Sequence, residues 1–373
     1  MNKTFIIILA AVFVLTGPAL GHCQDSASEQ GKKIDELIGK LGTRYWEKAA
    51  DELVQLGEAA VEPLIKTVNI GSGRPSENAV LVLARIGTPK AINVVVGALK
   101  NQKFTTRVRA YAAMALGDIG SEDHVGILIE ALQTDKDWWV RNFAVGSLGK
   151  IGSDEVVDPL IDAVDDENQY VRRAAVSALG ELKQDKAVLP LIGALRDEDW
   201  QVWLQVPEIL VEFGSRVEEP LLGTLKDENN WVKAGAAYVL GRLKSGVAVM
   251  PLISLLEDRE RMVRDEAAIA LSRINSEGAV QPLLGLLEHD TSWVRETAAW
   301  VLGEMKSKEA VRPLIQALND GEMGWMAAVA LGKIADEQAI EPLKRKMADQ
   351  DSRVGQAAAW ALARMKSQTR NDV

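Results

Sequence analysis

A repeat of about 31 residues is the sequence feature that most constrains the fold. A Pro-Leu string recurs along the chain, beginning at Pro63, Pro159, Pro190, Pro220, Pro251, Pro282, Pro313 and Pro342. From Pro159 onward the copies are 29 to 31 residues apart. Between Pro63 and Pro159, Val94 and Ile127 take the place of the proline. The chain therefore contains ten copies, and a period of this length predicts stacked units rather than a closed globule.

A second string precedes each of these and predicts a separate helix. It joins a Val and a basic residue to a Leu-Gly pair, with the Leu eight positions after the Val, as at Val108, Val140, Val171, Val232 and Val294. Apolar residues recur between them at helical spacing, for example at Val140, Phe143, Ala144, Leu148 and Ile151. The Pro-Leu string begins a second helix, with Val156, Leu160, Ile161 and Val164 on one face. Each unit is thus a helical hairpin that must stack on its neighbours.

Residues between the two helices agree with this reading. Gly120 and Gly152 lie where a first helix must end in a left-handed conformation. Ser121, Ser153 and Ser307 follow such ends and are candidate N-caps for the second helix. The recurrent proline falls early in that helix, where a missing N–H costs least.

The predicted fold class is all-α, a right-handed α-solenoid of about ten hairpins with a capping helix at each end. We place the repeats at 43–350, an N-terminal linker and capping helix at 24–42, and a C-terminal capping helix with a polar tail at 351–373. The two helices themselves are expected at 29–41 and at 353–365, because terminal repeats need a polar outer face. Hydrophobic residues make up 47% of the chain and aromatic residues only 5%, which suits helices better than a β-sandwich.

The order Asp, Val-Arg, Ala-rich helix, Leu-Gly, Pro-Leu-Ile is clearest in residues 166–195 and resembles the HEAT-repeat family. It is most similar to the short HEAT-like units named after phycobilisome lyases, and the resemblance covers residues 43–365. It implies a scaffold, and it implies that recurrent acid–base pairs form a structural ladder between adjacent repeats. The pairs are Asp135 and Arg141, Asp166 and Arg172, Asp227 and Lys233, and Asp258 and Arg264. A binding strip is the alternative role for these residues.

Residues 1–23 have the pattern of a signal peptide. Lys3 precedes an apolar core at 5–15, which Gly17 and Pro18 end before a cleavage point after Gly21. The core is too short to span a bilayer comfortably, since about 20 residues are needed, so an uncleaved membrane anchor is the weaker alternative. We therefore expect export to the periplasm or the extracellular space.

Cys23 is the single cysteine, so no internal disulfide can form. The sequence Leu20-Gly21-His22-Cys23 resembles a bacterial lipoprotein box, except that His22 stands where a small residue is expected. A lipid anchor at Cys23 would be the one membrane contact. The other interpretation is that Cys23 is removed with the leader or lies in a tail.

Charge and histidine content argue against nucleic acid as a partner and against a bound metal. The net charge is −10, whereas a surface that reads phosphates needs a basic face. His22, His124 and His289 do not form the His-Glu pairs with which HEAT-like deoxyhypusine hydroxylases hold iron. We predict surface positions for His124 and His289, no cofactor, and no catalytic residue.

The chain contains ten Trp, and several share one position in the repeat. Trp139, Trp231 and Trp293 immediately precede the repeat valine, Tyr170 has the same position, and Trp138 and Trp200 lie nearby. Stacking would place these rings in a row along one edge. The row is either an aromatic track for an extended peptide or glycan, or a set of staples that pack at each helix start.

One repeat departs from the pattern. In Trp200 to Phe213, Trp203 replaces the basic residue, Pro207 lies inside the helix and Val211 replaces the glycine. This repeat is either the centre of the binding surface, with Trp200 and Trp203, or simply a diverged copy. We predict a non-catalytic scaffold for a protein or peptide partner. The alternative is an accessory or chromophore- or cofactor-handling subunit of an enzyme complex.

Overall fold

The computed structural model describes the backbone of residues 19–348 and 352–371, and the side chains of 29–348 and 352–367. The apolar core of the predicted signal peptide and the Cys23 thiol lie outside the described residues. The described chain contains helices and no strand, which confirms the predicted all-α solenoid. It divides into two compact units, Met1–Ile151 and Gly152–Val373.

The first unit contains three complete hairpins, α2/α3, α4/α5 and α6/α7, preceded by α1 and followed by α8. The helices are α1 (Ala19–Lys40), α2 (Trp46–Leu56), α3 (Glu58–Val68), α4 (Gly73–Ile86), α5 (Pro89–Lys100), α6 (Thr106–Ile119), α7 (Val125–Thr134) and α8 (Trp138–Ile151). Consecutive even-numbered helices pack on one another, as α4 does on α6 and α6 on α8.

The second unit begins with α9 and continues with six complete hairpins and the final helix α22. The helices are α9 (Val157–Asp162), α10 (Gln169–Leu182), α11 (Val188–Gly193), α12 (Trp200–Glu212), α13 (Glu218–Thr224), α14 (Asn230–Arg242), α15 (Val249–Ser254), α16 (Arg261–Ile274), α17 (Val280–Leu286), α18 (Ser292–Glu304), α19 (Val311–Ala317), α20 (Gly324–Ile334), α21 (Ile340–Met347) and α22 (Arg353–Asn371). Short 3-10 turns extend many of the odd-numbered helices.

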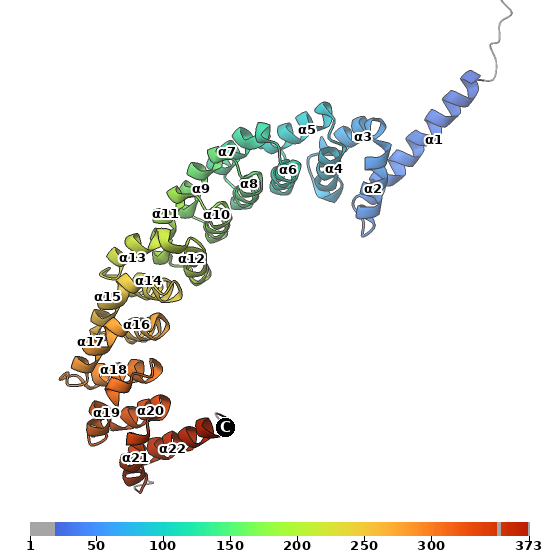
Figure 1. The fold of residues 1–373 in the computed structure, drawn as a ribbon. Coiled ribbons are helices and arrows are strands. Elements are labelled where there is room, and N and C mark those ends of the chain that lie inside the picture. The colour runs from blue at the N-terminus through green and yellow to red at the C-terminus, as the bar shows by residue number, and fades with distance from the viewer. Residues whose placement is uncertain (1–18, 349–351, 372–373) are drawn as a thin grey trace, which may run out of the picture. The chain divides into compact units, whose positions relative to one another are not determined.

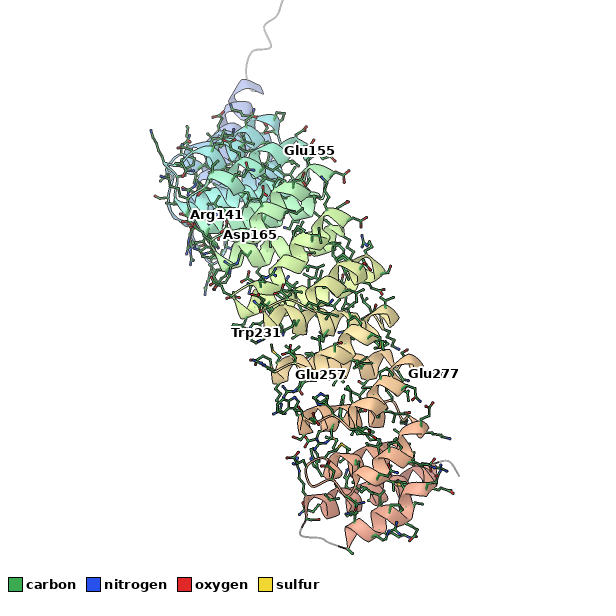
Figure 2. The ribbon with its side chains drawn as sticks, turned by 90° about the vertical axis from the view of Figure 1, so that its left-hand side faces the viewer. Arg141, Glu155, Asp165, Trp231, Glu257 and Glu277 are labelled. Carbon is green, nitrogen blue, oxygen red and sulfur yellow. The ribbon has the colours of Figure 1, made fainter. Side chains whose placement is uncertain are left out.

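Within each unit the hairpins form two layers. Even-numbered helices, which carry the Val-Arg and Leu-Gly strings, make one layer, and odd-numbered helices make the other (Figure 1). In the second unit, Trp231 at the start of α14 and Glu277 in the turn after α16 lie at opposite edges (Figure 2). Helix starts therefore form one edge of this unit and the turns between paired helices form the other.

The buried residues follow the predicted spacing. Val140, Ala144 and Leu148 are buried on α8, and Val156 and Leu160 are buried where α9 begins. Because these side chains are aliphatic or small, the two layers approach closely along the length of each unit. This continuous apolar seam is what a single hairpin could not bury alone.

The glycine of the Leu-Gly string marks the closest approach between neighbouring repeats. A Cβ built on Gly241 would lie 2.5 Å from the Cα of Ala270 on the next even-numbered helix, and one on Gly303 would lie 2.8 Å from the Cα of Ala330. The Leu-Gly string thus sets the distance between stacked helices rather than ending a helix.

The turns between paired helices bear out part of the sequence reading. Gly120 and Gly152 adopt the expected left-handed conformation, with φ of 70° and 71°. Ser121 accepts a hydrogen bond from the N–H of Asp123, but Ser153 and Ser307 make no such cap bond. The expectation for these two serines was wrong: each closes its turn through its backbone oxygen, which accepts the N–H of Val156 after Ser153 and the N–H of Ala310 after Ser307.

Three further expectations need correction. His124 is buried rather than at the surface, since the turn that carries it folds against α7. The N-terminal helix begins at Ala19 instead of residue 29, and α22 continues past Met365 to Asn371. Both extensions lack a helix-breaking proline, so backbone hydrogen bonding continues through the polar residues.

Pro207 does not break α12, which runs from Trp200 to Glu212. The proline is buried, as are Val206 and Leu210 beside it. Packing of this apolar segment therefore offsets the missing N–H, a loss of about 3 kcal/mol in an isolated helix.

Candidate functional site

A groove on the even-numbered layer of the second unit is the candidate site that brings together three tryptophan side chains. It has a volume of about 560 Å³ and is assembled from α16, α18, α20 and α22. Its aromatic wall consists of Trp293, Trp300 and Trp325, with Met326 beside them. Flat apolar rings and a flexible Met side chain offer a large contact area at a small entropic cost.

Cations line the same groove and lie over its rings. The guanidinium of Arg353 is 3.6 Å from the ring centre of Trp325, and that of Arg264 is 5.3 Å from the ring centre of Trp293. The indole N–H of Trp325 donates to Glu296, 3.4 Å away. The groove thus combines apolar faces with positive charge held at fixed places.

The predicted aromatic residues separate into several clusters instead of one uniform row. In the first unit Trp139 packs against Tyr111 and Phe143, with ring centres 6.2 and 5.5 Å away, and Trp138 is exposed at the start of α8. Tyr170 on α10 is exposed and lies beneath Arg173.

In the second unit Trp203 packs edge-on against Trp231, with ring centres 4.8 Å apart. Trp200 is 66% exposed, and Trp231 is 52% exposed. Of the predicted aromatic residues, Trp293 alone lines the groove. Both interpretations of the row therefore have examples: Trp139 is packed at a helix start, whereas Trp200 presents a free ring.

Sequence reasoning missed Trp300 and Trp325. Neither has the position directly before the repeat valine: Trp300 comes six residues after Val294, and Trp325 comes two residues after Met323, which takes the place of the valine. For Trp300 a signal was nonetheless present: Tyr238 and Trp360 also come six residues after the valines at 232 and 354.

The acid–base ladder connects adjacent repeats through carboxylates of the following repeat. Arg172 donates from Nε and Nη2 to Asp197, at 2.7 and 2.8 Å, and from Nη1 to the backbone oxygen of Asp166. Arg109 binds Asp135 in the same way, and Lys233 pairs with Asp258. Arg141 donates to the backbone oxygen of Asp135. Arg109 and Arg172 thus each hold their own turn and the next one.

The ladder carboxylates also close the turns that carry them. Asp258 accepts the backbone N–H of Glu260, and Asp227 accepts that of Asn229. Burial alone would raise the pKa of Asp258, but hydrogen bonds from Lys233 and from this N–H hold it below its ordinary value. The pKa of Asp135 is lowered for the same combination of causes, with Arg109 as the cation.

Two rungs of this ladder are altered in the second unit. Trp203 stands where the basic residue belongs, and Asp227 pairs instead with Arg196 from the turn before α12. His289 stands where the ladder carboxylate of the ninth repeat belongs, opposite Arg264. Each altered rung lies next to exposed tryptophan, Trp231 in one case and Trp293 in the other.

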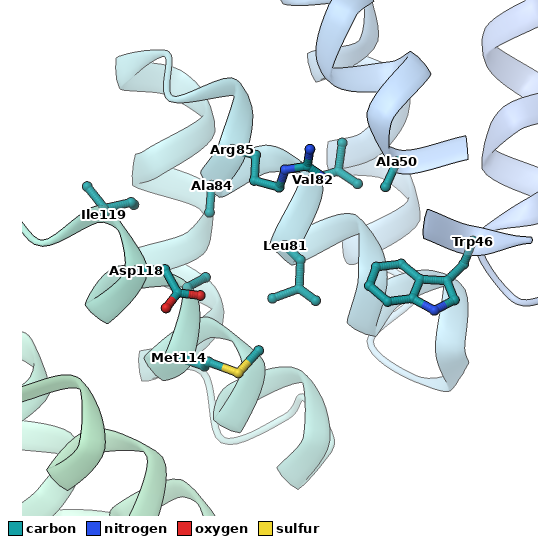
Figure 3. A pocket seen from close by; sticks show the side chains of 10 residues that line it. Trp46, Ala50, Leu81, Val82, Ala84, Arg85, Met114, Asp118 and Ile119 are labelled. Atoms are coloured by element: carbon teal, nitrogen blue, oxygen red, sulfur yellow. The ribbon is translucent and has the colours of Figure 1, made fainter. Parts of the chain in front are cut away.

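A smaller, more apolar groove lies on the same layer of the first unit, formed by α2, α4 and α6. Its volume is about 310 Å³, and Trp46, Leu81 and Met114 line it together with Ile119 (Figure 3). Arg85 and Asp118 lie at its margin. Asp118 is paired with Lys150, and Arg85 with Asp51, so these charges are already engaged within the unit.

Neither a membrane span nor a metal cluster is found in the part of the chain that the structure describes. None of those helices combines the length and apolar character that crossing a bilayer requires. Among the same residues, no group of three or more His, Cys, Asp or Glu side chains is arranged to hold a metal ion.

A family model for HEAT repeats matches residues 102–169, 157–222, 218–299 and 286–363. The chain therefore belongs to the HEAT-repeat family. A comparison with curated proteins gives no match.

Solved structures similar to this chain include importin β solenoids. One of importin β has a TM-score of 0.56 at 14% identity and covers 95% of this chain and 62% of its own. Kap95p, in a structure concerned with RanGDP, has a TM-score of 0.54 at 16% identity and covers 94% and 59%. A Kap95–Nup1 complex has a TM-score of 0.50 at 16% identity and covers 89% and 56%. The chain spans about three fifths of the length of these relatives, and the likeness shows the fold alone.

Proposed function

We propose that this protein is a non-catalytic scaffold and that the groove on α16, α18, α20 and α22 binds an extended segment of a partner protein. The observation that carries the proposal is the convergence of Trp293, Trp300 and Trp325 in one groove. Tryptophan is the residue type most enriched among those that dominate protein interfaces. Three such rings in one groove indicate a binding site.

The dimensions of the groove suit a peptide. Stacked helices are about 8 to 10 Å apart, so the three intervals from α16 to α22 span roughly 25 Å. A fully extended chain covers that distance with about seven residues. Rings placed on successive helices would contact side chains at intervals along such a segment, while the polar margin of the groove would bond its backbone.

Similar solenoids support the choice of a protein partner. One Kap95 structure concerns binding to RanGDP, and another is a complex with Nup1. Both partners are proteins. The formal charge of −10 points the same way, because a surface for nucleic acid would need clustered positive charge.

Two finer expectations from the sequence belong to this proposal. The short repeat with Val-Arg, Leu-Gly and Pro-Leu-Ile strings supports the phycobilisome-lyase-type subtype, and the apolar core at 5–15 supports export to an extracytoplasmic compartment. Fractionation of cells that express the full chain would test export. A handling factor for a chromophore, the alternative function, would retain visible absorbance after purification.

The first prediction concerns the aromatic wall. Peptides that bind the full chain are first selected from a random library. When Trp300 and Trp325 are both replaced by Ala, their affinity should fall about tenfold or more, because the loss of each ring removes a buried contact. Fluorescence anisotropy with the selected peptides measures the dissociation constants, and circular dichroism confirms that the variant is folded.

Trp200→Ala is the matched control, because this ring is even more exposed but lies outside the groove. We expect it to leave the affinity unchanged. Equal binding to wild type and to the Trp300→Ala, Trp325→Ala variant would contradict the proposal. Loss of binding in Trp200→Ala alone would move the site to the irregular sixth repeat.

A further inference from the structure

Arg264 is the one ladder arginine of the described second unit whose partner carboxylate is replaced by another residue type. Its Nη1 donates to the backbone oxygens of Asp258 and Arg259, at 2.9 and 2.8 Å. Arg172 makes the matching pair of contacts to Asp166 and Glu167. The two arginines are therefore held to their own turns in the same way.

Arg172 and Arg264 differ in the contacts of the other two guanidinium nitrogens, Nε and Nη2. Arg172 uses Nε and Nη2 as a fork for the two oxygens of Asp197, and Arg109 uses the same two atoms for Asp135. Within the described residues, no salt bridge involves Arg264, and its Nε and Nη2 have no hydrogen-bond partner. The fork is preformed because the Nη1 contacts fix the plane of the guanidinium.

His289 explains the difference. Its Nδ1 accepts the backbone N–H of Thr291 at 3.1 Å, which reproduces the turn-closing bond that Asp197 makes to Asp199. An imidazole that accepts there has no second oxygen to offer a guanidinium. The substitution thus keeps the turn and removes the carboxylate. Arg264 instead lies over Trp293 and lines the groove.

We infer that the fork of Arg264 receives a side-chain carboxylate of the bound segment, so that the partner is an acidic, extended peptide. The inference rests on the proposed function and names the chemistry of its ligand. A carboxylate is the group that the same fork binds at Arg109 and Arg172, with bidentate geometry. The neighbouring tryptophans would contact apolar residues on either side of the acidic one.

Charge in the rest of the groove is compatible with this ligand. Asp265 is already paired with Arg261, and Glu296 accepts the indole N–H of Trp325. Arg353 adds a second cation over the ring of Trp325. The overall negative charge of the protein acts at longer range and is screened at physiological salt.

The test compares a capped hexapeptide of alternating Glu and Leu with its Gln and Leu counterpart, both amidated and carrying a fluorophore. Anisotropy at physiological salt should show about tenfold tighter binding of the Glu peptide to the full chain. His289→Asp would supply the missing carboxylate, occupy the fork and abolish the preference. His289→Asn is the matched control, because its amide oxygen can close the turn without adding a charge, and the preference should remain.

Each outcome is informative. If neither peptide binds, the proposed function fails. If both bind equally, the groove binds peptides but the carboxylate inference is wrong. If a Gln peptide with a free C-terminus binds as tightly as the Glu peptide, the fork binds the carboxylate of a chain terminus. The assignment to a side-chain carboxylate would then be wrong. Preserved preference in His289→Asp, with an unchanged circular dichroism spectrum, would also overturn it.

Discussion

Gly241 lies where α14 approaches α16 most closely, and it shows how a single missing side chain sets the spacing of the stack. We predict that Gly241→Ala destabilises the protein by about 1 to 3 kcal/mol, because the added methyl would overlap the backbone of Ala270 and neither helix can retreat without opening the seam. Chemical denaturation followed by circular dichroism measures the change.

Gly146→Ala is the matched control in a helix of the same type. This glycine is exposed on α8, and a Cβ there would meet no atom within 4 Å. Alanine is the better helix former, so stability should stay the same or rise by up to about 1 kcal/mol. Equal losses in both variants would contradict the prediction, because only Gly241 has a neighbouring helix within reach of the added methyl.

At this scale the sequence predicted part of the candidate site. Trp293 was found because it repeats the position of Trp139 and Trp231. Trp300 and Trp325 were missed because a groove across several helices uses a different repeat position on each helix. A search for one recurring position finds a row of equivalent residues, whereas a binding surface is built from unequal ones.

The contacts between consecutive hairpins depend on ionised carboxylates. The pKa values of Asp135, Asp258 and Asp320 are all lowered in the folded chain. For Asp320 the main cause is the backbone N–H of Met323, which it accepts. Such groups stabilise the fold fully above the ordinary value of 3.8, and that stabilisation is lost as the pH falls through the lower folded values.

We therefore predict an unfolding temperature that changes little between about pH 7 and pH 5 and falls steeply below about pH 4. Asp135→Asn should lower stability at neutral pH by about 3 kcal/mol or more, since it leaves the buried Arg109 without its counter-charge. The same variant should flatten part of the acid dependence. Thermal unfolding across this pH range tests both statements, and an unchanged slope in the variant would exclude Asp135 as a contributor.

Much of the element pattern could be predicted because the repeat shows each helix several times. The helix ends were harder. Left-handed ends were expected at glycine, yet Lys183, Asn275 and Ala335 adopt the same conformation in later repeats. Packing on both sides fixes the backbone there regardless of local preference. The extents of α1 and α22 were underestimated because the added residues are mostly small or polar and carry no periodic apolar signal.

For the whole molecule, stability is distributed over contacts between neighbouring repeats. We predict that Gly117→Ala, which would place a methyl 2.7 Å from the Cα of Ser147, raises hydrogen exchange mainly in α6 and α8. Exchange in α14 to α20 should stay at its wild-type level. Mass spectrometry of exchanged peptides would resolve the two regions, and a uniform increase along the chain would mean that the array unfolds as one cooperative block.

The walls of the groove come from α16, α18, α20 and α22, so no single repeat forms the groove by itself. Duplication or loss of one repeat within this stretch would change which tryptophan rings line the groove, and a single such event would destroy the binding surface. Duplications among α2 to α7 would leave those four helices in sequence. Over the evolution of such a chain, we therefore expect the number of repeats to vary near its N-terminus and to stay fixed near its C-terminus.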